Sequence, residues 1–244
     1  MSGRICSRTG LRLVDGPGRM FRVAGNKPGR GPLNPVPRRA TTAADRLAWH
    51  RYDTVGLTIY GATRSDTALT EAIAYRAPDA NGYAALRAEA AYLGMSLDEL
   101  LRDLRRDGLT VDGLDREWSE SHSNYELDAS DGEWVDIRHP ETITTLKAAG
   151  LMERPHIWWA DLMGEDRMLT TLTAEWLRQS ELDTGSHPAG IRYASKFGMA
   201  DDLDHCWAEF LGGANPSRQV DEWPILSREE DARTAILRTG VHIA

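Results

Sequence analysis

The spacing of hydrophobic positions changes several times along the chain and predicts two kinds of element. Apolar residues recur near helical spacing in residues 83–106 and 165–181, so both segments are expected to be helices. Short runs rich in β-branched and aromatic residues predict strands at 57–60, 134–137, 191–195 and 206–211. Short strands scattered among helices of unequal length favour an α+β fold over alternating β–α units. The expected core is a mixed, mostly antiparallel sheet with flanking helices.

Local stop and start signals add two shorter helices. Ser65 or Asp66 is expected to cap a helix that runs to about Arg76. A second helix is expected to begin at Pro140, a residue favoured in the first helical turn, and to end near Gly150.

Three stretches lack such a pattern. Residues 1–19 are basic and rich in glycine, and they predict a flexible arm ahead of a single domain spanning residues 20–244. Residues 25–39, rich in glycine and proline, predict an irregular loop. The helical segment from residue 83 and the acidic, turn-rich residues 107–132 predict an insertion at about 83–132, part of it a mobile excursion.

Charge is divided unevenly along the chain. Residues 1–51 carry eleven Lys and Arg against Asp15 and Asp45, a net charge of +9. The remainder has 18 basic and 35 acidic residues, a net charge of −17. An acidic body argues against direct binding of nucleic acid. The basic segment is expected to meet either an anionic ligand or the protein's own acidic surface, and self-pairing is the simpler interpretation.

The chain has only two cysteines, Cys6 and Cys206, which fits a reducing compartment and excludes a disulfide framework. It contains no run of about 20 apolar residues, so no membrane segment is expected and the cytoplasm is the expected location. The glycine motifs of dinucleotide and P-loop sites are absent. No metal is expected either, because Asp201, Asp202, Asp204 and His205 crowd one short segment that is typical of a solvated turn.

Candidate chemistry gathers early in the sequence. Arg51-Tyr52-Asp53 precedes a glycine turn, Tyr60-Gly61-Ala62 ends the next strand, and Glu71 lies on the helix that follows. On that helix Glu71 falls at the edge of the apolar stripe, where a carboxylate can reach a cleft while the helix stays packed. From this pattern alone, a solvated surface glutamate is the simpler interpretation.

Five motifs in order resemble the RES family, named for Arg, Glu and Ser. They are Phe21-Arg22, Arg51-Tyr52-Asp53, Tyr60-Gly61-Ala62, Ala68-Leu69-Thr70-Glu71 and Gly190-Ile191-Arg192-Tyr193-Ala194-Ser195. Two features depart from the family. His50 precedes the central arginine where glycine is usual, and Tyr52 follows it where Trp or Phe is usual. The segment 83–132 is also longer than in a compact member. The resemblance implies an ADP-ribosyltransferase-like fold and cleavage of NAD⁺, in several members as the toxin of a toxin–antitoxin pair.

If that chemistry carries over, each motif acquires a role. Arg22 and Arg51 are expected to anchor the pyrophosphate of NAD⁺, because guanidinium groups match phosphate oxygens in pairs. Tyr60 is expected to stack on nicotinamide or hold the ribose, and Glu71 to stabilise the oxocarbenium-like centre. Ser195 is expected to bind ribose or phosphate rather than act as a nucleophile. NAD⁺ is thus the substrate, and no cofactor is expected.

The attacking group is left open by the sequence. Water implies an NAD⁺ glycohydrolase, inorganic phosphate a phosphorylase, and a protein side chain an ADP-ribosyltransferase. A catalytically silent RES-fold binding module is a further alternative. The resemblance implies an antitoxin as a protein partner, and the sequence leaves a homo-oligomer open.

Overall fold

The structure is a computed structural model that describes residues 3–29, 31–39, 42–76, 80–107, 113–151, 157–197, 204–212 and 216–243. Within these residues the framework is one nine-stranded sheet of order β1-β2-β7-β8-β9-β4-β3-β6-β10. Its strands are β1 Gly3–Ile5, β2 Arg12–Asp15, β3 Arg19–Gly25, β4 Thr58–Ala62, β6 His122–Asp128, β7 Glu133–Asp136, β8 Gly190–Ala194, β9 His205–Phe210 and β10 Arg218–Pro224. Neighbouring strands run antiparallel except β7 and β8, which are parallel. The expected α+β fold with a mixed, mostly antiparallel sheet is confirmed.

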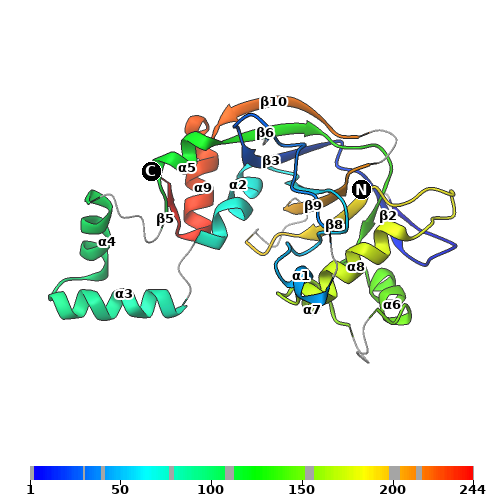
Figure 1. Cartoon of the computed structure of the whole chain (residues 1–244), viewed down its shortest axis with the longest axis horizontal. Helices are drawn as coiled ribbons and strands as arrows, with labels where there is room; N and C mark the ends of the chain where they lie inside the picture. The colour runs from blue at the N-terminus through cyan, green and yellow to red at the C-terminus, as the bar shows by residue number, and fades with distance from the viewer. Residues whose placement is uncertain are drawn as a thin grey trace.

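Helices flank the sheet in two groups (Figure 1). One group is α1 Ala43–Leu47, α6 Pro140–Ala148, α7 Trp159–Met163 and α8 Arg167–Gln179. The other is α2 Ser65–Ile73, α5 Arg116–Ser121 and α9 Glu229–Thr239, accompanied by 3₁₀ turns at Ala74–Arg76 and Ile225–Ser227. A small parallel pair, β5 Gly113–Leu114 and β11 His242–Ile243, lies beside the second group. Helices α3 Ala80–Leu93 and α4 Leu97–Arg106 project from the rest of the molecule.

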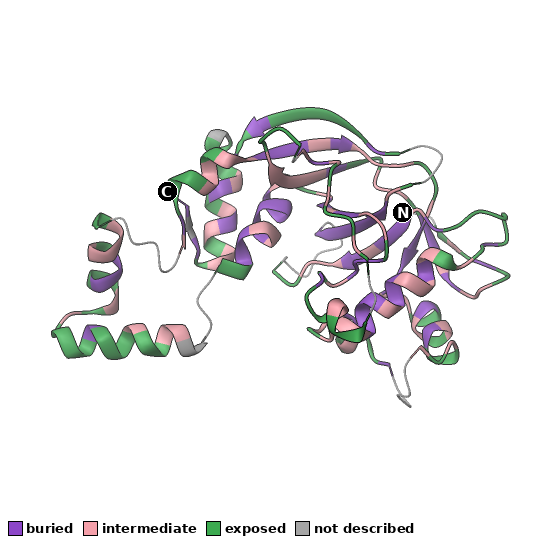
Figure 2. Ribbon diagram, viewed as in Figure 1, coloured by how far each residue is buried: buried purple, intermediate pink, exposed green. Residues whose placement is uncertain are grey.

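Alternating strand residues build separate cores on the two faces of the sheet. Val135 and its neighbours pack against α6, α7 and α8, whereas the adjacent Trp134 enters a cluster on the other face. Burial is therefore concentrated on the strands and on the inner faces of the helices, as Figure 2 shows. This period of two follows from the pleat of a strand.

The expected flexible arm is wrong. Residues 3–15 contain β1 and β2, which pair with each other, and β2 also pairs with β7. Cys6 and Leu11, between the two strands, are fully buried. The apolar positions are too few to show a period, yet they fill the core beside α8. The basic charges pair with the acidic body, for example Arg4 with Glu133 at 2.8 Å and Arg8 with Glu181 at 2.6 Å. Self-pairing of the two charged halves is thus observed, and the start of the predicted domain at residue 20 falls inside the sheet.

The expected insertion is also wrong in part. His122–Asp128 is β6, which pairs with both β3 and β10, so it belongs to the sheet and is no excursion. The sequence did not indicate this strand because it contains several polar residues. Of these, Glu126 and Asp128 face outward and pair with Arg19 and Arg218. Residues 108–112 lie outside the described residues.

Helix boundaries differ from expectation at two places. The helix expected over 83–106 is two helices, separated where Gly94 adopts a positive φ of 69° and Ser96 caps α4. The helix expected to be capped by Ser65 or Asp66 has Arg64 as its N-cap, with no side-chain cap, and Ser65 is its first residue. The other expected strands and helices lie within about two residues of their predicted bounds.

Candidate functional site

Two motif residues that lie far apart in the sequence, Glu71 and Ser195, are in direct contact. The hydroxyl of Ser195, just after β8, donates a hydrogen bond to Glu71 Oε1 on α2 at 2.6 Å. The backbone N–H of Lys196 donates to the same oxygen at 3.1 Å, and that of Phe197 donates to Ser195 Oγ at 3.1 Å. Glu71 is therefore held in place by two donors from one short segment.

Local packing fixes this orientation. Leu69 and Ile73 are fully buried and seat α2 on its core, which leaves the half-buried Glu71 at the edge of the apolar stripe. The sheet then brings the end of β8 toward α2, because β9 pairs with β8 on one side and with β4, the strand before α2, on the other. Sheet order, rather than sequence proximity, creates the contact.

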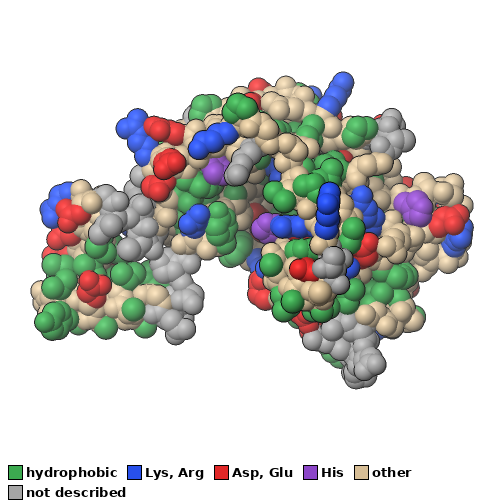
Figure 3. All heavy atoms as spheres, viewed as in Figure 1, with side chains coloured by type: hydrophobic (Ala, Val, Ile, Leu, Met, Phe, Trp, Pro, Cys, Tyr) green, Lys and Arg blue, Asp and Glu red, His purple; other side chains and the backbone are tan. Residues whose placement is uncertain are grey.

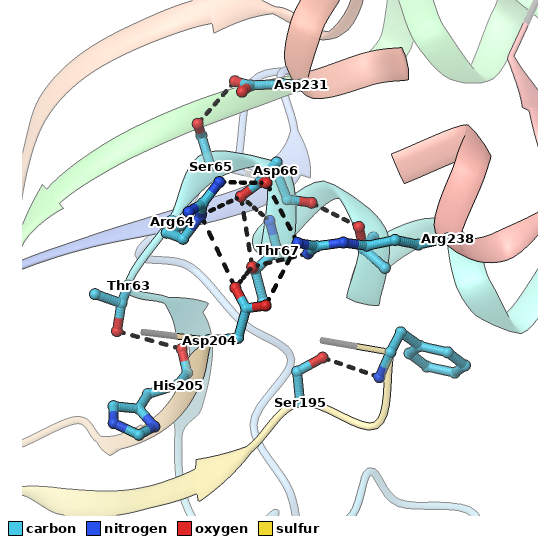
Figure 4. A network of polar contacts seen from close by, with 12 residues as sticks. Thr63, Arg64, Ser65, Asp66, Thr67, Ser195, Asp204, His205, Asp231 and Arg238 are labelled. Atoms are coloured by element: carbon cyan, nitrogen blue, oxygen red, sulfur yellow. Dashed lines mark hydrogen bonds and ion pairs between the residues drawn. The ribbon is translucent and has the colours of Figure 1, made fainter. Parts of the chain in front are cut away.

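A network of ion pairs clamps the start of α2 (Figure 4). Asp66 and Asp204, each 4% exposed, lie between the guanidinium groups of Arg64 and Arg238. Arg64 donates to both oxygens of Asp66 at 2.9 and 2.8 Å, and Arg238 lies 3.4 Å from Asp204. Thr67 donates to Asp204 at 2.6 Å. The network ties α2 to α9 and to the entry of β9, and so stabilises the helix that carries Glu71.

Arg22 and Arg51 bring positive charge to the same region. Arg22, on β3, donates from Nη1 to the carbonyl of Tyr60 at 2.8 Å. The guanidinium of Arg51 lies 5.9 Å from the ring centroids of Tyr52 and Tyr193. The Nε atoms of both arginines are buried and have no hydrogen-bond partner. Burial lowers the pKa of Arg22 to about 10, so its side chain remains protonated at neutral pH.

The hydroxyl of Tyr60 is already engaged. It donates to Asp53 Oδ1 at 2.8 Å and accepts from the backbone N–H of Tyr52 at 3.2 Å. Burial, followed by the charge of Asp53, raises the pKa of Tyr60 well above its usual value. The imidazole of His50 packs edge-on against the ring at 5.9 Å. These contacts orient the ring, and a stacking role for it stays a prediction.

The structure adds charged residues that the sequence motifs do not include. Glu165 accepts a hydrogen bond from Arg167 Nη2 at 2.5 Å and pairs with the ammonium of Lys196, which directly follows Ser195. Its pKa is lowered, chiefly by the hydrogen bond from Lys196 and also by the charges of Arg167 and Arg51. Lys196 was within reach of sequence reasoning as a neighbour of the last motif. Nothing in the pattern marks Arg167, which the start of α8 carries into the site.

Figure 3 shows that the molecule is hollowed near the middle of the viewed face, with basic side chains and a histidine at the rim of the hollow. The described residues contain no group of three or more His, Cys, Asp or Glu suited to a metal ion. Of the acidic segment considered above, Asp201 and Asp202 lie outside the described residues, and His205 Nδ1 meets Arg138 Nη1 at 3.1 Å. In the described part of the chain, no helix combines the length and the hydrophobicity of a membrane span.

Comparison with known proteins gives one likeness. No family model matches the chain, and no curated protein matches it. The chain is similar to one in the crystal structure of the M. tuberculosis MbcT–MbcA toxin–antitoxin complex, with 10% sequence identity and a TM-score of 0.46 over 94% of this chain and 91% of that chain.

Proposed function

We propose that this protein cleaves the nicotinamide–ribose bond of NAD⁺. The observation that carries the proposal is the hydrogen bond from Ser195 to Glu71, which fixes a carboxylate beside the backbone of Lys196. The ammonium of Lys196 in turn pairs with Glu165, on which the charges of Arg167 and Arg51 also act. A carboxylate beside several cations suits a ligand that combines an anionic pyrophosphate with a sugar that becomes cationic during the reaction.

The arginines supply the affinity. Arg22 and Arg51 each have a buried N–H without a partner, and leaving such a group unpaired costs free energy. A pyrophosphate offers several acceptor oxygens, and hydrogen bonds from a guanidinium to phosphate are strengthened by charge. The dinucleotide's phosphates thus accept hydrogen bonds from N–H groups that have no partner within the protein.

Glu71 supplies the electrostatic stabilisation. When the bond breaks, its electron pair moves to the nicotinamide nitrogen, which leaves as a neutral base, and positive charge develops on the ribose ring. The carboxylate of Glu71 stabilises that charge, or orients the ribose hydroxyls, and the nucleophile then bonds to the ribose carbon. Nicotinamide needs no proton to depart, so the site requires no general acid.

Ser195 acts as a positioning residue. Its hydroxyl donates to Glu71 and accepts from the N–H of Phe197, so its proton is directed at a carboxylate that already accepts a second hydrogen bond. No histidine contacts it among the hydrogen bonds of the described residues. Holding Glu71 and then the ribose or a phosphate is the role that fits these contacts.

The test is to incubate the purified protein with NAD⁺ and follow nicotinamide release, with and without inorganic phosphate. Release that needs phosphate identifies a phosphorylase, and release without it a glycohydrolase. Adenine-labelled NAD⁺ that leaves label on protein identifies an ADP-ribosyltransferase. If the folded protein binds NAD⁺ without releasing nicotinamide under any of these conditions, the cleavage proposal is wrong and a binding module remains.

We further propose that the activity serves as a toxin in the cytoplasm, held in check by a protein antitoxin. The NAD⁺ pool is the target, and the scarcity of cysteines suits a reducing compartment. Induced expression in a bacterial host is expected to lower cellular NAD⁺ and stop growth, and a Glu71→Ala variant expressed at the same level is expected to do neither. Unchanged growth and NAD⁺ with active, soluble protein would remove the toxin role while leaving the enzymatic one.

A further inference from the structure

An exposed carboxylate holds two largely covered cations together at the site. Glu165 pairs with the ammonium of Lys196 through Oε1 and accepts from Arg167 Nη2 through Oε2 at 2.5 Å. The Glu165 side chain is 67% exposed, whereas those of Arg167 and Lys196 are each 25% exposed. The acid is thus the accessible member of the triad and the cations are its covered members.

These cations belong to the same positive region as the predicted NAD⁺ anchors. The pKa of Glu165 is lowered first by the hydrogen bond from Lys196 and then, against desolvation, by the charges of Arg167, Lys196 and Arg51. The pKa of His50 is lowered first by partial desolvation, and Arg38, Arg167 and Arg22 add to that lowering against the opposite effect of Asp53. The charge of Arg167 therefore acts on Glu165 together with that of Arg51, and on His50 together with that of Arg22.

Glu165 does not satisfy all the hydrogen-bond donors of Arg167. The Nη1 atom of Arg167 is buried and has no hydrogen-bond partner, as are the Nε atoms of Arg22 and Arg51. A carboxylate has two oxygens, and Glu165 has already committed one to each cation. A pyrophosphate carries more acceptor oxygens and more charge, so it can satisfy the same cations and the unpaired N–H groups together.

We propose that Glu165 is an internal stand-in for the substrate's pyrophosphate: it pairs with Arg167 and Lys196 and is displaced from them when a diphosphate ligand binds. The choice of ligand rests on the proposed function. Displacement is feasible because an exposed ion pair is weak and Glu165 gains hydration when it swings away. Displacing Glu165 costs free energy and so lowers the affinity for every ligand of Arg167 and Lys196. A ligand that lacks a diphosphate group does not offset this cost and competes poorly with Glu165 for the two cations.

Calorimetric titration of the full chain with inorganic pyrophosphate and with ADP-ribose tests this proposal. Glu165→Gln removes the competing charge, so both ligands are expected to bind about three- to fivefold more tightly than to the wild type, the scale of one exposed ion pair. Arg167→Gln removes a charged donor and is expected to weaken both by about tenfold. Glu165→Ala provides a second variant in case the glutamine forms new contacts, and it is expected to tighten binding likewise.

Glu181→Gln is the matched control. Glu181 also forms a partly exposed ion pair, with Arg8 at 2.6 Å, but lies past the far end of α8, about 20 Å from Arg167 along the helix axis. The Glu181→Gln substitution removes one negative charge, as Glu165→Gln does, but at a distance where salt screens its effect on the ligand. The affinities for pyrophosphate and ADP-ribose are therefore expected to stay within about twofold of the wild type. Equal tightening in Glu181→Gln and Glu165→Gln would mean that net charge alone is responsible and would overturn the proposal.

Other results separate this inference from the proposed function. Wild-type affinity in both Glu165 variants, or no binding of either ligand to any of the proteins, overturns the stand-in. Neither ligand contains the nicotinamide–ribose bond, so their binding does not depend on cleavage. If the Glu165 variants bind more tightly but the wild type releases no nicotinamide, the role of Glu165 is supported and the enzymatic proposal fails. If the wild type releases nicotinamide but the Glu165 variants bind no more tightly, only the proposed role of Glu165 is wrong.

Discussion

Replacing Glu71 by glutamine isolates the charge of this residue from its geometry. The amide oxygen of glutamine can still accept from the Ser195 hydroxyl and from the N–H of Lys196, which lie 2.6 and 3.1 Å from Glu71 Oε1. What disappears is the negative charge next to the reacting sugar. The variant therefore tests the electrostatic role directly, with the supporting contacts retained.

The size of the effect follows from Coulomb's law. A full charge about 4 Å from the carboxylate interacts by about 4 kcal/mol at an effective dielectric constant near 20. Glu71 is half-buried, and the charge on the sugar is only partly developed in the transition state, so the expected loss is smaller. We expect kcat for nicotinamide release to fall by about 10²-fold, the equivalent of about 2.7 kcal/mol. The loss of stability is expected to be below about 1 kcal/mol, because a charge-assisted hydrogen bond becomes a neutral one.

The assay is nicotinamide release at saturating NAD⁺, with the melting temperature measured on the same samples. Glu175→Gln is the matched control, since Glu175 accepts hydrogen bonds from the N–H of Val55 and from Gln179, both at 2.8 Å, and neither of these is a motif residue. It should keep the wild-type rate. A Glu71→Gln variant that retains more than about a tenth of the wild-type kcat while the control is normal would refute electrostatic stabilisation by this carboxylate.

Three further variants test the proposed phosphate anchor Arg51, the ion-pair network at the start of α2, and the packing of β8 in the sheet. Arg51→Lys keeps the charge but loses the planar fork, and is expected to raise KM for NAD⁺ by about tenfold with a smaller change in kcat, a pattern that steady-state kinetics resolve. Arg238→Ala leaves buried acids short of a partner and is expected to cost about 2–4 kcal/mol in urea unfolding at pH 7. Burial acts to raise the pKa of Asp66, but the hydrogen bond from Arg64 and the charges of Arg64 and Arg238 outweigh it and lower that pKa. Ionised Asp66 therefore stabilises the fold above about pH 4, and this stabilisation is lost at lower pH. The difference in unfolding free energy between Arg238→Ala and the wild type should narrow there. Gly190→Ala places a methyl group 2.3 Å from the carbonyl oxygen of Ala208, and is expected to destabilise the protein by about 2 kcal/mol or more, whereas an unchanged melting temperature would contradict this packing.

The sequence located most elements because their signals are local. The apolar face of residues 165–181 and the β-branched run around Ile59 depend only on near neighbours, and α8 and β4 follow them closely. Residues 3–15 and β6 were missed because their order comes from partners elsewhere in the sheet. Arg19 on β3 neutralises Glu126 on β6, so a polar-looking stretch becomes an interior strand of the sheet. Propensity cannot report such pairing.

The site divides in the same way. The motifs named Arg22, Arg51, Tyr60, Glu71 and Ser195 through a family resemblance, and spacing on the helix placed Glu71 at the edge of its apolar stripe. No local signal identified Arg167 or Glu165, since each looks like an ordinary surface residue at the start of a helix. Glu165 pairs with both Arg167 and Lys196 only because the beginning of α8 and the end of β8 meet in space.

By itself, then, the sequence determined the α+β class, the approximate positions of most helices and strands, and a short set of residues suited to an anionic substrate. The tertiary structure alone decided that residues 3–15 extend the sheet and that two residues 124 positions apart, Ser195 and Glu71, meet through a hydrogen bond from Oγ to Oε1. The physical reason is that periodicity and capping act over a few residues. Strand order and charge pairing are instead set by burial of the whole sheet, which couples distant segments that no local pattern connects.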